Sequence, residues 1–121
     1  MVEIPLQQLP SQELRVVLEG TLNCTLFLYW RDWRLYADLD VGAESVFRGC
    51  VCLNGQAVNQ SPSAAFTGKL VFIDTQGSEH PRWEGLGDRW ALLYLTKEEC
   101  SGYPLVRDAV AAALEEAEGD A

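Results

Sequence analysis

Alternation of apolar and polar residues at every second position is the feature that most constrains the fold of this chain. In TLNCTLFLYW, residues 21–30, alternate side chains from Leu22 to Trp30 would lie on one face of an extended strand. Runs of this kind recur at roughly ten-residue intervals and are separated by turn-forming residues. They cover residues 13–18, 21–30, 34–40, 44–53, 56–58, 68–75 and 89–95. The pattern predicts an all-β fold, a small antiparallel β-barrel or sandwich of about seven strands with a short C-terminal helix.

Glycine-containing turns separate several of these runs. Asn54 and Gly55 lie between the runs 44–53 and 56–58, and Asn-Gly favours a two-residue hairpin turn because both residues tolerate positive φ. Gly85 and Gly87 precede the last run and are expected to form a corner. A dinucleotide-binding loop would follow a strand and open a helix, whereas this glycine pair follows a loop and opens a strand.

The last run, residues 89–95, is apolar on both of its faces. Alternate residues from Trp90 to Tyr94 would lie on one face, and those from Ala91 to Leu95 on the other. A strand of this kind needs cover on both sides. The second cover is either the C-terminal segment of the same chain or a neighbouring subunit.

The period becomes helical after Pro104. One helix face would carry Val106, Val110, Ala113, Leu114 and Ala117. Four acidic residues lie at the negative end of this helix, so we expect it to fray after about Leu114. They are Glu115, Glu116, Glu118 and Asp120.

The C-terminal part of the chain also differs in charge. Residues 96–121 hold two basic and seven acidic side chains, and therefore −5 of the net charge of −9. We expect two units, a β domain over 1–95 and an acidic helical extension over 96–121. Val106, Val110 and Leu114 of the extension are candidate interface residues.

The composition argues against several classes of partner. Nine basic residues face eighteen acidic ones, which is the wrong balance for binding nucleic acid. No stretch of 18 apolar residues is present, and the N-terminus lacks the pattern of a signal peptide, so we expect a soluble chain made in the cytoplasm, with no membrane contact. The cysteines are Cys24, Cys50, Cys52 and Cys100. Their spacing favours reduced, packed thiols over a disulfide or a metal site, and no cofactor is expected.

The candidate catalytic residues lack the surroundings that catalysis needs. His80 stands in a loop, and neither Cys100 nor Asp88 lies in a nucleophile motif. Asp38 and Asp40 share one strand face, where solvated carboxylates are a simpler interpretation than an acid–base pair or a weak cation site. We therefore expect no enzyme, and a cysteine-dependent enzyme using Cys100 or the Cys50/Cys52 pair is the weakest hypothesis.

Two tryptophans in or beside predicted loops suggest an alternative function. Trp33 and Trp83 could form the ligand site of a small β-barrel binding module, together with the loop 75–88. Trp83 is equally a candidate for a lid on the core or for an anchor in a protein interface.

Four sequence segments resemble those of a known family. IPLQQLPSQELRVVLEG, GCVCLNGQAV, GKLVFIDTQG and GLGDRWALLYL occur in the order and spacing of the small baseplate plug proteins of contractile-tailed bacteriophages. The resemblance covers about residues 3–95, and the acidic extension departs from it.

The resemblance implies a structural virion component of the tail baseplate, without catalytic activity. It would plug or line the central region near the hub, spike and tail-tube proteins. Strands that are apolar on both faces are also typical of a subunit of a symmetric assembly. Together with the baseplate location that the resemblance implies, this leads us to expect a cyclic homo-oligomer with three- or six-fold symmetry.

Overall fold

The computed structural model describes residues 1–61 and 63–119, the last four of these by their backbone only. Within these residues the chain forms seven strands, two α-helices and one short 3-10 helix. In chain order they are β1 (Val2–Ile4), β2 (Ser11–Leu18), β3 (Leu22–Arg31), β4 (Arg34–Val41), β5 (Glu44–Val51), β6 (Lys69–Asp74), η1 (Trp83–Gly85), β7 (Trp90–Leu95), α1 (Lys97–Cys100) and α2 (Val106–Gly119). No helix in the described part of the chain is long and apolar enough to span a membrane.

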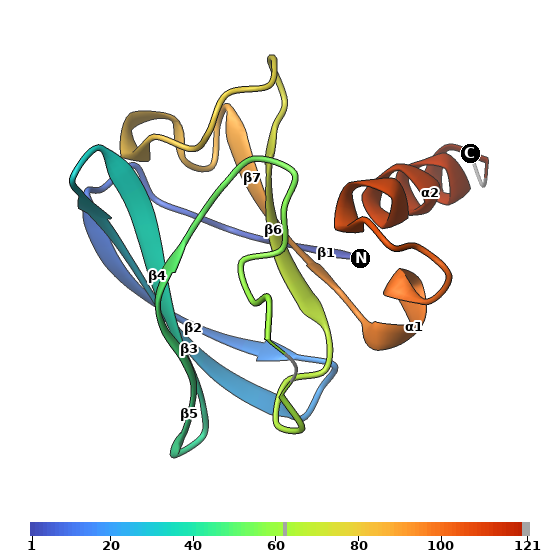
Figure 1. The fold of residues 1–121 in the computed structure, drawn as a ribbon, viewed down its shortest axis with the longest axis horizontal. Coiled ribbons are helices and arrows are strands. Elements are labelled where there is room, and N and C mark those ends of the chain that lie inside the picture. The colour runs from blue at the N-terminus through green and yellow to red at the C-terminus, as the bar shows by residue number, and fades with distance from the viewer. Residues whose placement is uncertain (62, 120–121) are drawn as a thin grey trace.

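The strands form two antiparallel sheets. One has the order β2-β3-β4-β5 and the other β1-β7-β6. The sheets face each other without closing into a barrel, and α2 covers the outer face of the three-stranded sheet (Figure 1). The predicted all-β class is confirmed, and of the two predicted architectures the chain forms the sandwich.

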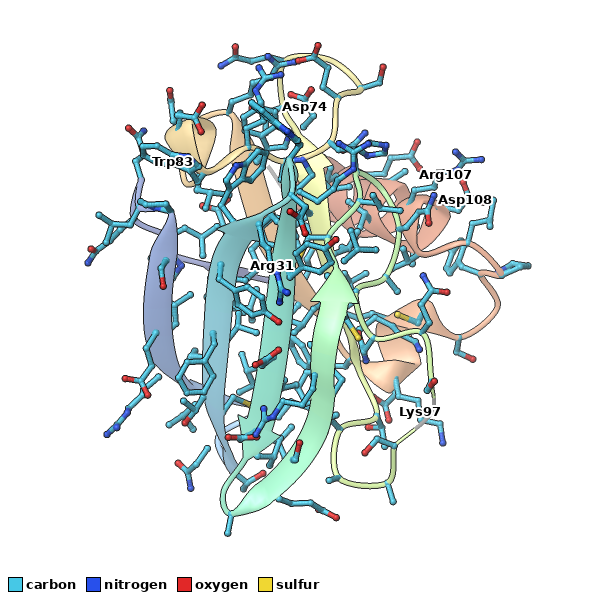
Figure 2. The ribbon with its side chains drawn as sticks, turned by 60° about the vertical axis from the view of Figure 1, so that its left-hand side comes forward. Arg31, Asp74, Trp83, Lys97, Arg107 and Asp108 are labelled. Carbon is cyan, nitrogen blue, oxygen red and sulfur yellow. The ribbon has the colours of Figure 1, made fainter. Side chains whose placement is uncertain are left out.

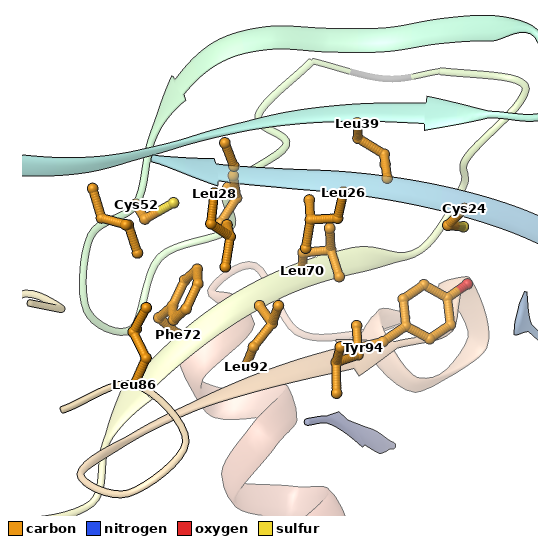
Figure 3. Packing of buried hydrophobic residues seen from close by; sticks show 14 of the residues in the cluster. Cys24, Leu26, Leu28, Leu39, Cys52, Leu70, Phe72, Leu86, Leu92 and Tyr94 are labelled. Carbon is orange, nitrogen blue, oxygen red and sulfur yellow. The ribbon is translucent and has the colours of Figure 1, made fainter. Parts of the chain in front are cut away.

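The main core lies between the two sheets, where the alternating pattern places its apolar residues. Leu26 and Leu28 of β3 point toward Phe72 of β6 and toward Leu92 and Tyr94 of β7 (Figure 3). All five side chains are at most 1 % exposed. Fully burying a side chain of this size contributes roughly 1.5–3 kcal/mol, so the faces of β3 and β7 account for much of the driving force for folding.

A second, smaller core lies between the three-stranded sheet and α2. Val71 of β6 and Leu93 and Leu95 of β7 pack there against Ala109 and Val110 of α2. The second face of the last strand is therefore covered by the helix of its own chain. The neighbouring subunit is not needed for that cover.

The prediction of a hairpin at Asn54 and Gly55, in which the segment 56–58 would pair with the strand before it, was wrong. The segment 56–58 does not pair with β5 but follows the edge of β6, where Ala57 bridges Val71 and the N–H of Val58 donates to Leu70 at 2.8 Å. Backbone polar groups at the edge of a buried strand need partners, and this segment supplies them. The seventh strand is instead β1, which pairs with β7 and is too short to show an alternating pattern.

Helix α2 is longer than the sequence predicted. It continues to Gly119, whereas we expected fraying after about Leu114. Alanine and glutamate are strong helix formers, and repulsion between one acidic side chain and the helix dipole costs only about 0.3–1 kcal/mol, so propensity prevails. The side chain of Ala117, predicted on the apolar face, lies outside the described residues.

Candidate interaction surfaces

The three candidate interface residues of α2 have different environments. Val110 is buried at 3 % exposure, and Val106 is half-buried against the same small core. Leu114 is 47 % exposed and is followed by the exposed Glu115. Of the three, Leu114 is therefore the one with most surface free for a partner.

A buried ion pair anchors the loop between β6 and β7. The carboxylate of Asp74 accepts two hydrogen bonds from the guanidinium of Arg89, both at 2.8 Å, and its side chain is fully buried. It also accepts from the backbone N–H groups of Gln76 and Glu79, each at 2.9 Å. The hydrogen bonds from Arg89 hold the pKa of Asp74 well below its usual range. The loop is thus tied at both ends to one charged residue, at the end of the sandwich where Figure 2 labels Asp74.

The predicted glycine corner lies in this loop and packs around Trp90. The guanidinium groups of Arg82 and Arg89 both lie over the ring of Trp90, with their carbon atoms 5.1 and 4.7 Å from its centroid. A Cβ at Gly85 would lie 2.4 Å from that ring. Gly87 has φ +79°, and a Cβ there would lie 2.6 Å from the carbonyl oxygen of Leu6. Both glycines thus allow the chain to pass close to its neighbours.

The turn predicted at Asn54 and Gly55 connects the two sheets. Gly55 has φ +73°, and its N–H donates to the carbonyl of Phe72 at 2.8 Å. The side-chain oxygen of Asn54 accepts from the N–H of Asp74, at 2.8 Å. The backbone N–H of Asn54 donates to Nδ1 of His80, at 3.1 Å. His80 therefore fixes a loop, a contact that the sequence did not reveal.

The two loop tryptophans do not form one site. Trp83 lies in η1, half-buried against the core between the sheets. Trp33 is 82 % exposed and lies with Asp32 in the turn between β3 and β4, where both residues have positive φ, +49° and +64°. The binding module proposed around both residues would therefore have to be built on Trp33 alone.

A groove runs beside Trp33. Trp30, Trp33 and Arg34 line one side and residues 78–82 the other, around a volume of about 390 Å³. Arg34 donates to the carbonyl of Trp33 at 3.1 Å. Trp33 and part of the loop 75–88, both named from the sequence for the binding module, thus line one groove, whose lining also includes Arg34 and does not include Trp83.

The carboxylates on the outer face of the four-stranded sheet each have a polar partner. The hydroxyl of Tyr29 donates to Asp38 at 2.9 Å, and the N–H of Gly49 donates to the same oxygen at 2.7 Å. Asp40 pairs with Arg48 at 2.7 Å. These contacts favour a structural role for the two aspartates over the weak cation site considered from the sequence.

The four cysteines are free thiols in the structure. Cys24 and Cys52 are buried, and Cys50 and Cys100 are partly exposed. Burial raises the pKa of each thiol. A raised pKa keeps the thiol protonated at neutral pH, and the protonated form is a poor nucleophile.

Comparison with known proteins identifies the family. A family model described as the cyanophage baseplate Pam3 plug gp18 matches residues 1–98. A comparison of the sequence with curated proteins finds no match. The matched range includes every strand of both sheets and ends within α1, before α2 begins. The resemblance noted in the sequence is confirmed: the chain belongs to this family of baseplate plug proteins and is a structural component of the phage virion, located in the tail baseplate in association with other baseplate or tail proteins.

Proposed function

We propose that this protein plugs or lines the central hub and tube region of the baseplate, through contacts with copies of itself and with hub, spike and tail-tube proteins. The family match carries the proposal, because it spans the whole sandwich rather than one motif. The role is structural and non-catalytic.

The environments of the reactive residues support a non-catalytic role. Full or partial burial raises the pKa of all four thiols. His80, the single histidine of the chain, accepts a backbone hydrogen bond from Asn54. Asp74 is occupied by Arg89. His80 and Asp74 thus each have a structural task, and the raised pKa values make the thiols poor nucleophiles.

In this proposal the β domain, residues 1–95, and the acidic extension, residues 96–121, make different contacts. The sandwich would supply the contacts common to the family, since the match covers it. The acidic extension would supply contacts particular to this chain, since α2 lies beyond the match. The expected assembly is a closed ring with three- or six-fold symmetry, because a protein on the axis of a cyclic assembly shares that symmetry most simply.

Purified virions test this function. Quantitative mass spectrometry of particles, separated from free protein by density-gradient centrifugation, should detect the chain at a fixed ratio to the tail-tube protein. Particles from a phage lacking the gene should lose this protein and show an altered centre of the baseplate. If the chain is absent from wild-type particles, the proposed function is wrong.

A further inference from the structure

Trp33 has a backbone conformation that is unfavourable for a tryptophan. A bulky aromatic residue rarely adopts a left-handed backbone conformation such as φ +64°, and a two-residue hairpin turn favours Asn or Gly there. The side chain is 82 % exposed, so it adds little to the core. Unfavourable backbone conformations that persist in a structure concentrate at functional sites.

The groove beside Trp33 offers hydrogen-bond donors. Among the described residues Arg34 makes no ion pair, whereas the nearby Arg82 and Arg89 both pair with Glu79. His80 accepts a hydrogen bond at Nδ1, so the proton of its neutral ring lies on Nε2. An apolar ring beside a guanidinium that makes no ion pair within the described residues matches a partner with an apolar side chain next to a carboxylate.

The distal part of α2 has the complementary chemistry. Leu114 is 47 % exposed, and the next residue, Glu115, is exposed as well. The last turn of α2 contains no basic residue, so Glu115 lies near the negative end of the helix dipole without a cation of its own helix to offset it. A guanidinium from another molecule would stabilise this end.

The two surfaces cannot meet within one molecule. Figure 1 shows the turn between β3 and β4 and the distal part of α2 at opposite ends of the long axis. We propose that Leu114 and Glu115 of one copy dock in the Trp33 groove of the next copy, with Leu114 against Trp33 and the carboxylate of Glu115 accepting from Arg34 and His80. A contact between two different surfaces of identical subunits joins them head to tail, and closes into a ring when the rotation allows it. The inference rests on the self-assembly part of the proposed function and identifies the residues that would join one copy to the next.

Charge reversal tests this contact directly. Sedimentation analysis at low ionic strength, over a concentration series, should show association of the wild-type protein that weakens as salt is added. Arg34→Glu and Glu115→Arg should each weaken association by about tenfold or more, and the double variant should recover most of it. Trp33→Ala and Leu114→Ala should weaken association at least as strongly.

Arg15→Glu is the matched control, because it makes the same charge change at an exposed position on β2, outside the groove. It should leave association unchanged, and circular dichroism should show all variants folded. The inference is overturned if the wild-type chain stays monomeric, if the double variant does not recover, or if Arg15→Glu weakens association as much as Arg34→Glu. The virion measurement is independent of these results: a monomeric chain found in virions refutes the head-to-tail contact alone, and a chain absent from virions refutes the proposed function.

Discussion

Val110 packs α2 against the outer face of the three-stranded sheet, and Val110→Ala tests how much this packing contributes to the free energy of unfolding. The side chain is 3 % exposed and packs in the small core with Val71 and Leu93. The substitution removes two buried carbon groups at about 0.8 kcal/mol each, roughly 1.6 kcal/mol in all, and any cavity left behind adds to this loss. Alanine has the higher helix propensity and returns up to about 0.7 kcal/mol. We expect a net loss of about 1–2 kcal/mol in the free energy of unfolding.

Urea unfolding, followed by circular dichroism and tryptophan fluorescence, gives this free energy if both probes show one transition. Arg107→Ala is the control, since Arg107 is exposed on the same helix and the change should stay within about 0.5 kcal/mol of wild type. A loss below about 0.5 kcal/mol for Val110→Ala would show that α2 does not stabilise the sandwich, and the account of the second core would then be wrong.

Three further predictions concern the turns, the buried ion pair and the thiols. Gly87→Ala should destabilise the fold by about 1–3 kcal/mol more than Gly20→Ala in urea unfolding. Both glycines have positive φ, but only at Gly87 would a new Cβ meet the backbone of Leu6. Equal losses for the two variants would exclude the close approach of Gly87 to Leu6. The hydrogen bonds from Arg89 lower the pKa of Asp74 in the folded state, so their stabilisation of the fold is present above about pH 4 and is lost as the pH falls below it. Asp74→Asn should therefore be less stable than wild type at pH 7, and its free energy of unfolding should fall less between pH 4 and pH 2. A variant whose stability depends on pH as that of the wild type does would contradict this. A thiol reagent at neutral pH should label Cys50 and Cys100 before the buried Cys24 and Cys52, as peptide mass spectrometry can follow, and early labelling of Cys52 would contradict its burial.

Local periodicity was sufficient to predict the strands that form the main core. Residues such as Leu26 and Leu28 alternate with polar neighbours, and that alternation decides which side chains face the second sheet. The order of the strands and the openness of the sandwich depend on contacts between distant segments, which no local pattern contains. For the same reason the segment 56–58 was assigned to β5, its neighbour in sequence, when it lies against β6.

The surfaces were harder to predict than the core. The sequence singled out Trp33, Leu114 and the loop 75–88, but not Arg34, because the groove depends on two loops that meet only in the folded chain. Val110 was a candidate for an interface and is instead buried within the chain. Periodicity shows that a helix has an apolar face, but does not identify what covers it.

Cryo-electron microscopy of the intact virion tests the central claim most directly. The account predicts density for the two-sheet sandwich, with α2 against β6 and β7, on or around the tail axis at the centre of the baseplate. Sandwich density confined to the periphery of the baseplate, or no such density in a particle known to contain the chain, would contradict it.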